Sequence, residues 1–218
     1  MRTVYKAVRG EYTEKKSRFI ADLFYIESEE EAEAALARVR KEFYDARHHC
    51  SAFVLAGSGQ PVLRSSDDGE PQGTAGHPML DVLTGMGIVN CLAVVTRYFG
   101  GTLLGTGGLV RSYTKALQDA LEKSIIIERK NGIPLTVTAD YTAIGKLDYY
   151  FAKEELPALN KEYGENVKET LLIPEERLEK VKSDIVQMTG GKALLGTENA
   201  IEYAVLDGTV LTGDALLG

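Results

Sequence analysis

The sequence predicts an α+β protein with two domains, residues 1–130 and residues 131–218. Segments with the composition of strands alternate with amphipathic helices in the first part, a pattern typical of helices packed on a sheet. The composition changes at Asn131-Gly132, and the predicted elements that follow are ordered strand, helix, strand, strand, helix, strand. This is the split βαβ order of ferredoxin-like domains, so we expect that fold in the second part.

The first domain is predicted to begin with two strands, at residues 3–9 and 17–26, because both segments are rich in β-branched and aromatic side chains. Ser28 followed by Glu31 is a capping-box pattern, which predicts a helix that runs to about Tyr44. The next elements are expected in this order: a strand at 49–56, a turn at 57–61, a loop at 65–73, a helix capped by Thr74, a buried strand at 88–96, a glycine-rich loop at 100–108, and a helix with Val110, Thr114, Leu117 and Leu121 on one face.

The second domain repeats this mixture of strands and helices. Pro174 suits the first turn of a helix, because that turn has N–H groups without partners and proline has none to lose. The expected elements are a strand at 133–139, a helix at 143–155, strands at 156–163 and 167–173, a helix from Pro174 to Gly190-Gly191, and a strand at 200–206. Residues 207–218 lack a pattern, and we expect a short mobile tail there.

Charge is divided unequally between the two parts. The chain of 218 residues has 25 basic and 32 acidic side chains, and residues 1–130 carry 17 of each, which leaves 8 basic and 15 acidic side chains for residues 131–218. An acidic surface repels phosphate backbones, so the second part is disfavoured for contact with nucleic acid. The first part could still present a local basic patch.

The composition also bears on the compartment. Cys50 and Cys91 are too few for a disulfide framework, which favours a reducing environment. The uncharged stretch at residues 82–96 is too short and too interrupted by Gly85, Gly87 and Asn90 to span a bilayer. The N-terminal residues lack the apolar segment of a secretory signal. We therefore predict a cytoplasmic protein that does not act at a membrane.

The glycine-rich segment is the most informative part of the sequence. Five of the nine residues from 100 to 108 are glycine, between a predicted strand and a predicted helix. Glycine allows a close approach of the backbone to a ligand, and the start of a helix offers free N–H groups at its positive end. These features predict a site for an anion or a nucleic acid, formed by Arg97, Tyr98, Gly100, Gly101, Gly105, Gly107, Gly108, Arg111 and Lys115.

Known phosphate-binding patterns do not fit this loop. The residue after Gly105 is Thr106, where a P-loop needs lysine, and Val110 stands where a dinucleotide fingerprint needs glycine or alanine. An equally weighted alternative is that the glycines make tight turns and close packing between helix and strand.

Asp67, Asp68 and Glu70 form a secondary candidate site, because a hard cation binds carboxylate oxygens. The spacing of a calcium loop is absent, however, and turn formation and helix capping explain the same residues. His48 and Cys50 could share one face of a strand, but we predict no metal site there and no cofactor.

Three sequence motifs are specific when they occur together, and this chain resembles the YigZ/IMPACT family in all of them, in particular its bacterial two-domain members of the YigZ and YvyE type. The motifs are His48-His49-Cys50-Ser51-Ala52, then Ser66-Asp67-Asp68-Gly69-Glu70-Pro71 with Gly73-Thr74-Ala75-Gly76 and Pro78, and Arg97-Tyr98-Phe99-Gly100-Gly101 with Leu104-Gly105 and Gly108-Leu109-Val110-Arg111.

The resemblance covers about residues 17–122. It implies an N-terminal domain with the fold of ribosomal-protein S5 domain 2 and a ferredoxin-like C-terminal domain, a pair similar to the last two domains of elongation factor G, which contact the ribosome. It also implies a link to translation, since eukaryotic relatives act in translational control by binding a protein activator of an amino-acid-starvation kinase.

Two functions follow as hypotheses. The first is a non-catalytic regulator or ribosome-associated binding protein, in which Arg97, Tyr98, Arg111 and Lys115 contact RNA phosphates or an acidic protein partner. Tyr98 and Phe99 could stack on a base in this hypothesis, although we favour core packing for Phe99 because it follows a buried run. The alternative is an enzyme that holds a phosphorylated or nucleotide substrate at the same loop, with Asp67, Asp68 or Glu70 as metal ligand or base. Oligomeric state is not predicted.

Overall fold

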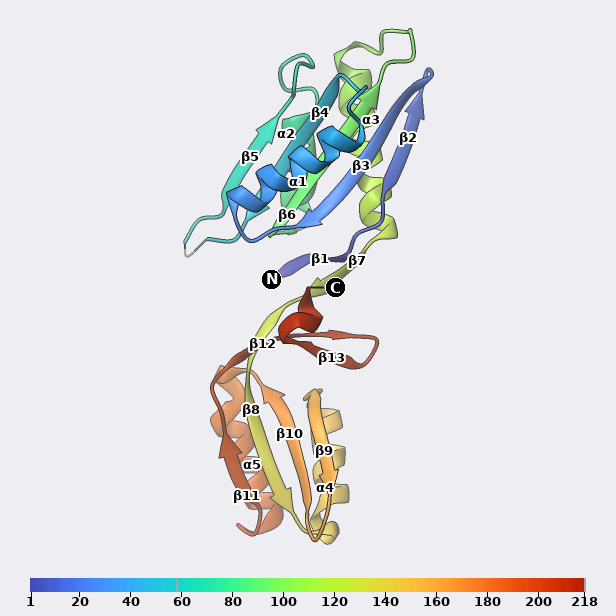
Figure 1. Ribbon diagram of the computed structural model, residues 1–218. Coiled ribbons are helices and arrows are strands. Elements are labelled where there is room, and N and C mark those ends of the chain that lie inside the picture. The colour runs from blue at the N-terminus through green and yellow to red at the C-terminus, as the bar shows by residue number, and fades with distance from the viewer. Residues whose placement is uncertain (58, 218) are drawn as a thin grey trace. The chain divides into compact units, whose positions relative to one another are not determined.

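The computed structural model describes residues 1–57 and 59–217, and its contacts divide the chain into two compact units (Figure 1). Unit 1 comprises residues 1–128 with Leu217, and unit 2 comprises residues 129–216. Both units combine helices with antiparallel sheets, so the protein is of the mixed α+β class.

Unit 1 is built on a five-stranded sheet in which every pair of neighbouring strands is antiparallel. Its order is β2 (Gly10–Glu14), β3 (Ser17–Tyr25), β6 (Cys91–Tyr98), β4 (His48–Leu55) and β5 (Val62–Ser66). A second, two-stranded sheet pairs β1 (Arg2–Lys6) with β7 (Ile125–Glu128).

Helices cover both faces of the five-stranded sheet: α1 (Glu29–Glu42) lies on one face, and α2 (Gly76–Gly85) and α3 (Gly105–Lys123) lie on the other (Figure 1). Alternate residues of a strand point to opposite faces, so a central strand covered on both faces needs apolar residues on both, as β6 has from Cys91 to Val95. Its residues Leu92 and Val94 pack in the cluster that contains the buried face of α1, and Ala93 and Val95 pack in the cluster that contains α2 and α3. This double burial explains the apolar run at residues 91–95.

Unit 2 has a central strand, β8 (Lys130–Ala139), that pairs with β10 (Val167–Ile173), which in turn pairs with β9 (Ala158–Tyr163). On its other side β8 pairs with β11 (Leu194–Thr197) and, nearer its beginning, with β12 (Ile201–Leu206). Leu135 of β8 and Leu171 of β10 pack in one core with residues of α4 (Tyr141–Lys153) and α5 (Leu178–Thr189).

Several predicted elements differ from those observed. Strands β2 and β11 were not predicted, because they are short, largely exposed strands without an apolar run. Helix α3 begins at Gly105, within the segment expected to be a loop. The helix expected from Pro174 begins at Leu178, after the 3₁₀ turn Glu175–Arg177. The expected turn at 57–61 includes Ser58, which lies outside the described residues.

Residues 207–216 form a turn, a strand and a 3₁₀ helix, where the sequence was expected to have a tail without regular structure. Asp207 and Gly208 both have positive φ, at 49° and 79°, which is the conformation of a two-residue hairpin turn. This turn joins β12 to β13 (Thr209–Thr212), and the 3₁₀ helix Gly213–Leu216 follows. The Asp-Gly pair was the signal for the hairpin that the sequence analysis did not use.

The helices within residues 1–57 and 59–217 are all too short or too polar to cross a membrane.

Candidate functional site

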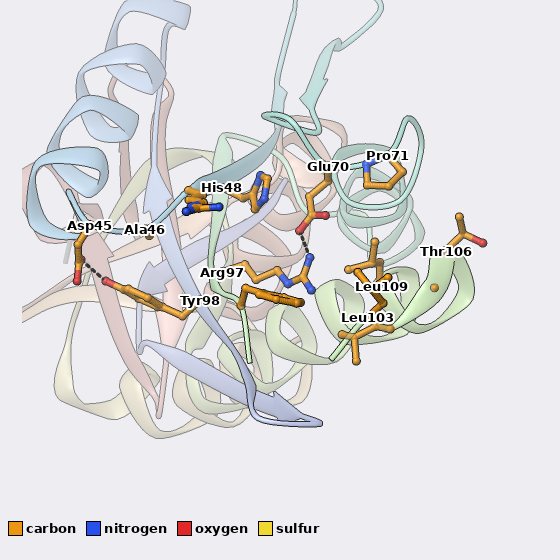
Figure 2. Close-up of a pocket in the computed structure, with 14 residues that line it drawn as sticks. Asp45, Ala46, His48, Glu70, Pro71, Arg97, Tyr98, Leu103, Thr106 and Leu109 are labelled. Atoms are coloured by element: carbon orange, nitrogen blue, oxygen red, sulfur yellow. Dashed lines mark hydrogen bonds and ion pairs between the residues drawn. The ribbon is translucent and has the colours of Figure 1, made fainter. Parts of the chain in front are cut away.

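The candidate site lies in unit 1, where β6 ends and β4 begins. His48 and Arg97 are cross-strand partners at this end of the sheet. The loop after β5 and the start of α3 border the same place and enclose a cavity of about 670 Å³ (Figure 2). His48, Glu70, Arg97, Phe99, Leu103 and Thr106 are among the residues that line it.

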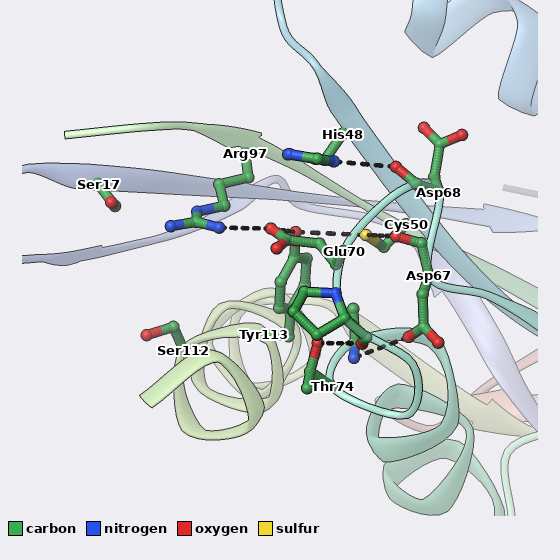
Figure 3. A network of polar contacts seen from close by, with 12 residues as sticks. Ser17, His48, Cys50, Asp67, Asp68, Glu70, Thr74, Arg97, Ser112 and Tyr113 are labelled. Atoms are coloured by element: carbon green, nitrogen blue, oxygen red, sulfur yellow. Dashed lines mark hydrogen bonds and ion pairs between the residues drawn. The ribbon is translucent and has the colours of Figure 1, made fainter. Parts of the chain in front are cut away.

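A buried ion pair forms one wall of the cavity. Arg97 Nη1 donates to Glu70 Oε1 at 2.6 Å, and the two side chains are only 7% and 3% exposed. The Tyr113 hydroxyl of α3 donates to the same carboxylate oxygen at 2.8 Å, and the Cys50 thiol lies 3.2 Å from the Tyr113 oxygen (Figure 3). Glu70 therefore fastens its loop to β6 and α3 at once.

The buried network holds its protons firmly. Burial raises the pKa of the Cys50 thiol to about 12 and raises the pKa of Tyr113 well above the usual range of a phenol. Cys91 is also buried, and burial raises its pKa to about 12. A thiol is a poor nucleophile until it ionises, so these side chains support the structure and are unsuited to covalent catalysis at neutral pH.

The carboxylates of the secondary candidate site have separate partners. Asp67 accepts hydrogen bonds from the N–H groups of Gly73, Ala75 and Gly76, at 2.7, 3.0 and 2.8 Å. Burial opposes ionisation of Asp67, but these three N–H groups outweigh it and lower the pKa of the carboxyl. Asp67 thus caps the start of α2, whereas Thr74, the expected cap, donates to the carbonyl of Pro71.

Asp68 also serves the chain itself. Its Oδ1 accepts from Arg40 Nη2 at 3.0 Å, and its Oδ2 accepts from the N–H of His49 at 2.7 Å. Within residues 1–57 and 59–217 there is no group of three or more His, Cys, Asp or Glu side chains arranged to hold a metal ion. Asp67, Asp68 and Glu70 therefore do not converge, and the turn-and-capping interpretation explains them better than the cation hypothesis.

The glycines of the predicted anion site have different roles. A side chain at Gly100 would overlap the backbone of Lys16 and Ser17, and its N–H donates to Ser17 Oγ at 3.1 Å. Gly105 has φ of +70° and begins α3. These two positions serve packing and a turn, as the alternative interpretation expected. Gly101 also has positive φ, and Gly108 packs against Leu104. Gly107 is exposed and has no comparable structural reason.

The start of α3 is open. Leu104 precedes the helix and supplies no side-chain hydrogen bond to it, and the first turn contains no acidic residue. Gly105, Thr106 and Gly107 are exposed, and the first two border the cavity. The first N–H groups of a helix lack partners within the helix, so this end of α3 combines accessible donors with the positive end of the helix dipole.

The predicted basic residues do not form one cluster. Arg97 faces Glu70 in the cavity, whereas Arg111 and Lys115 border a smaller pocket of about 200 Å³ together with Lys15 and Tyr12. Lys115 Nζ lies 3.2 Å from the Tyr12 hydroxyl. Leu104 borders both pockets, so they lie on either side of the start of α3.

Two aromatic residues complete the cavity. The Tyr98 hydroxyl donates to Asp45 Oδ1 at 2.6 Å, and this hydrogen bond raises the pKa of Tyr98 to about 12. Phe99, expected in the core, is 55% exposed because it follows the last residue of β6, where the sheet no longer covers it. The Arg97 guanidinium lies 5.4 Å from the centroid of the Phe19 ring and 5.6 Å from that of the Phe99 ring.

Sequence reasoning missed Lys15, Asp45, Leu103 and Tyr113. Leu103 is 84% exposed, and an apolar residue inside a glycine-rich loop was the available signal. Lys15 has positive φ in the turn between β2 and β3, and its place beside α3 depends on the fold.

Comparisons with known proteins match both units. The family model of the Impact N-terminal domain matches residues 15–121, and a domain of unknown function, DUF1949, matches residues 137–192. The chain is 37% identical over 191 residues to the IMPACT family member YvyE of Bacillus subtilis (strain 168), with 88% of each protein covered. It is 37% identical over 183 residues to the IMPACT family member YigZ of Escherichia coli (strain K12), with 83% of this chain and 89% of that protein covered. A solved structure titled as the crystal structure of an hypothetical protein is 34% identical, with a TM-score of 0.57 over 89% of this chain and 95% of that chain.

Proposed function

The chain belongs to the IMPACT family, and from this premise we propose that it is a non-catalytic, translation-linked regulator that binds RNA or the ribosome through unit 1. The link to translation is what the resemblance to eukaryotic relatives implies. The observation that carries the proposal is the open start of α3, which lies between a cavity with an exposed aromatic ring and a pocket with three cationic side chains.

The cationic pocket supplies contacts for phosphate groups. Lys15, Arg111 and Lys115 are all exposed, and none of them forms a salt bridge with a described residue. Glu14 also lines this pocket, and its carboxylate accepts from the Tyr12 hydroxyl at 2.9 Å. Exposed cations beside an uncapped helix start attract anions without first breaking an internal ion pair. The acidic charge of unit 2 disfavours contact with RNA, so in this proposal unit 2 contacts a protein partner or orients unit 1 on its target.

The buried chemistry supports a binding role over catalysis. Cys50 and Tyr113 share a hydrogen bond, and Glu70 accepts hydrogen bonds from Tyr113 and Arg97. Burial keeps the thiol and the phenol protonated. A nucleophile or a general base must be able to reach a substrate and change its protonation state near the working pH. These residues instead form a rigid support beneath the cavity.

The arrangement of strands and helices supports the two domain types that the family resemblance implies. In unit 2 the strands β11, β8, β10 and β9 are adjacent in this order and antiparallel, and they share a core with α4 and α5, which is how a ferredoxin-like domain is arranged. We infer that unit 1, a sheet with helices on both faces, is a domain of the ribosomal-protein S5 domain-2 type.

The test is binding of RNA and of ribosomal subunits as a function of salt. Each phosphate contact adds about one unit to the slope of log affinity against log salt, so Lys15→Ala, Arg111→Ala and Lys115→Ala should each lower that slope by about one or less. Lys41→Ala is the matched control, because Lys41 is an exposed cation on α1. Binding that is insensitive to salt and to all three substitutions would contradict the proposal.

A further inference from the structure

We propose that the cavity at the end of β6 binds one unstacked nucleotide, with its base against Phe99 and its phosphate at the start of α3. This inference rests on the proposed function and assigns a ligand class to the cavity. The nucleotide can come from a single strand of RNA or from a free mononucleotide, and the experiment below separates these sources.

Phe99 provides a rigid surface for a base. The Arg97 guanidinium lies near one side of its ring, and Arg97 is itself fixed by Glu70 and by the ring of Phe19. Leu103, which is almost fully exposed, borders the same cavity. Because the surface is built before any ligand arrives, stacking on Phe99 requires little reordering of the protein.

Polar groups are placed for the edge of a base. His48 Nδ1 lies 2.9 Å from the carbonyl oxygen of Asp68, and a carbonyl oxygen only accepts, so Nδ1 carries the proton. The other ring nitrogen of the neutral imidazole is then an acceptor, and it points away from Asp68 (Figure 3). His48 borders the cavity, so this nitrogen can accept from an N–H group of a base.

A second polar atom lacks a partner. Arg97 Nε is buried and makes no hydrogen bond to any residue within 1–57 and 59–217, although its side chain lines the cavity. A buried N–H donor without a partner is costly, and a ligand oxygen or ring nitrogen would satisfy it. This atom points to a ligand independently of the helix start.

The phosphate position follows from α3. The helix is 19 residues long, has no capping side chain and has no acidic residue in its first turn. Thr106 borders the cavity on one side, and Leu104 connects it to the pocket of Lys15, Arg111 and Lys115 on the other. A strand of RNA could therefore place one base in the cavity and carry its next phosphates to these cations.

The experiment compares four ligands: a single-stranded RNA 12-mer, the same sequence as a duplex, a mixture of nucleoside monophosphates, and inorganic phosphate. Fluorescence anisotropy measures the RNA arms, and protein thermal shift measures the others. The variants are Phe99→Ala, Phe99→Trp as the variant that keeps a stacking ring, and Tyr149→Ala as an exposed aromatic control in unit 2. Phe99 is half exposed, and circular dichroism would verify that its variants fold.

We expect the single strand to bind more tightly than the duplex. Phe99→Ala should weaken binding of the single strand at least about fivefold, and binding of the duplex should change less than twofold. Phe99→Trp should bind the single strand as tightly as the parent chain does. Tyr149→Ala should have no effect.

Each other outcome has a definite meaning. RNA binding that ignores Phe99 and does not distinguish single strand from duplex overturns this inference and leaves the proposed function standing. Binding of mononucleotides that depends on Phe99, without any binding of RNA, supports the cavity and overturns the RNA function. A response to inorganic phosphate alone, or to no ligand, overturns the inference.

Discussion

The starts of α2 and α3 both follow loops that border the cavity, but among the described residues only the start of α2 has a side-chain acceptor for its N–H groups. At the start of α2, the N–H groups of Ala75 and Gly76 donate to the carboxylate of Asp67. The ion pair between Glu70 and Arg97 holds the loop that carries Asp67. The start of α3 has no cap and no acidic residue in its first turn. Two carboxylates, those of Asp67 and Glu70, thus fix the start of α2, and the start of α3 stays accessible. The motif residues around α2 therefore have a structural role, and those around α3 are free to contact a ligand.

The largest expected effect is on the free energy of unfolding, through the buried ion pair that holds the loop before α2. Arg97→Ala leaves Glu70 buried without its cation, and we expect a loss of about 3–5 kcal/mol in the free energy of unfolding. Urea denaturation would measure it. Arg111→Ala is the matched control, since it removes an exposed arginine and should change stability by no more than about 0.5 kcal/mol. Equal losses for both variants would remove the distinction between a structural and an available arginine.

The cap itself should contribute less and should depend on pH. Asp67→Ala should cost about 1 kcal/mol at pH 7, because it removes the acceptor of three backbone N–H groups. The folded pKa of Asp67 lies below the unfolded value of about 3.9, so its contribution is present above that pH and is lost as the pH falls through the folded pKa.

Urea denaturation of Asp67→Ala and the parent chain between pH 7 and pH 2 would check this. The difference between the two should shrink below about pH 4. Glu33→Ala, which removes an exposed carboxylate of α1, is the control. A difference that stays constant down to pH 2 would contradict the assignment of Asp67 as an ionised cap.

The smallest effect on stability is expected at the start of α3, where a substitution should change RNA binding most. Thr106→Glu places a negative charge in the first turn of α3, which should stabilise the fold by about 0.5 kcal/mol through the helix dipole. The same charge should repel a phosphate and weaken RNA binding about tenfold or more, if it offsets one favourable contact of about 1.4 kcal/mol. Thr106→Gln is the uncharged control. Unchanged RNA binding by Thr106→Glu would show that the start of α3 is not the anion site.

Local patterns in the sequence predicted much of this comparison. The apolar run at 88–96 gave β6, and Ser28 does accept from the N–H of Glu31 at the start of α1. The acidic loop was explained in advance by capping, and Asp67 confirms that interpretation. These features depend on residues within ten positions of one another, so periodicity and capping rules reach them.

Distant pairings were out of reach. Glu70 and Arg97 are 27 positions apart, and nothing local indicates that they share a buried ion pair. The same holds for Lys15, which joins Arg111 and Lys115 only because β2 and β3 pack beside α3. Arg97 pairs with Glu70 and lies apart from Arg111 and Lys115, which local sequence patterns did not indicate. The roles of Arg97, Arg111, Lys115 and the glycines in binding an anion remain predictions that binding experiments must test.

The depth of the two cysteines gives the protein an internal reporter. Cys50 and Cys91 are the only thiols in the sequence, and both lie sealed in unit 1. Alkylating reagents can reach them only when that unit opens, because a buried, protonated thiol neither meets the reagent nor reacts with it. The rate of labelling therefore follows the opening of unit 1 alone, and a ligand that binds this unit should slow it.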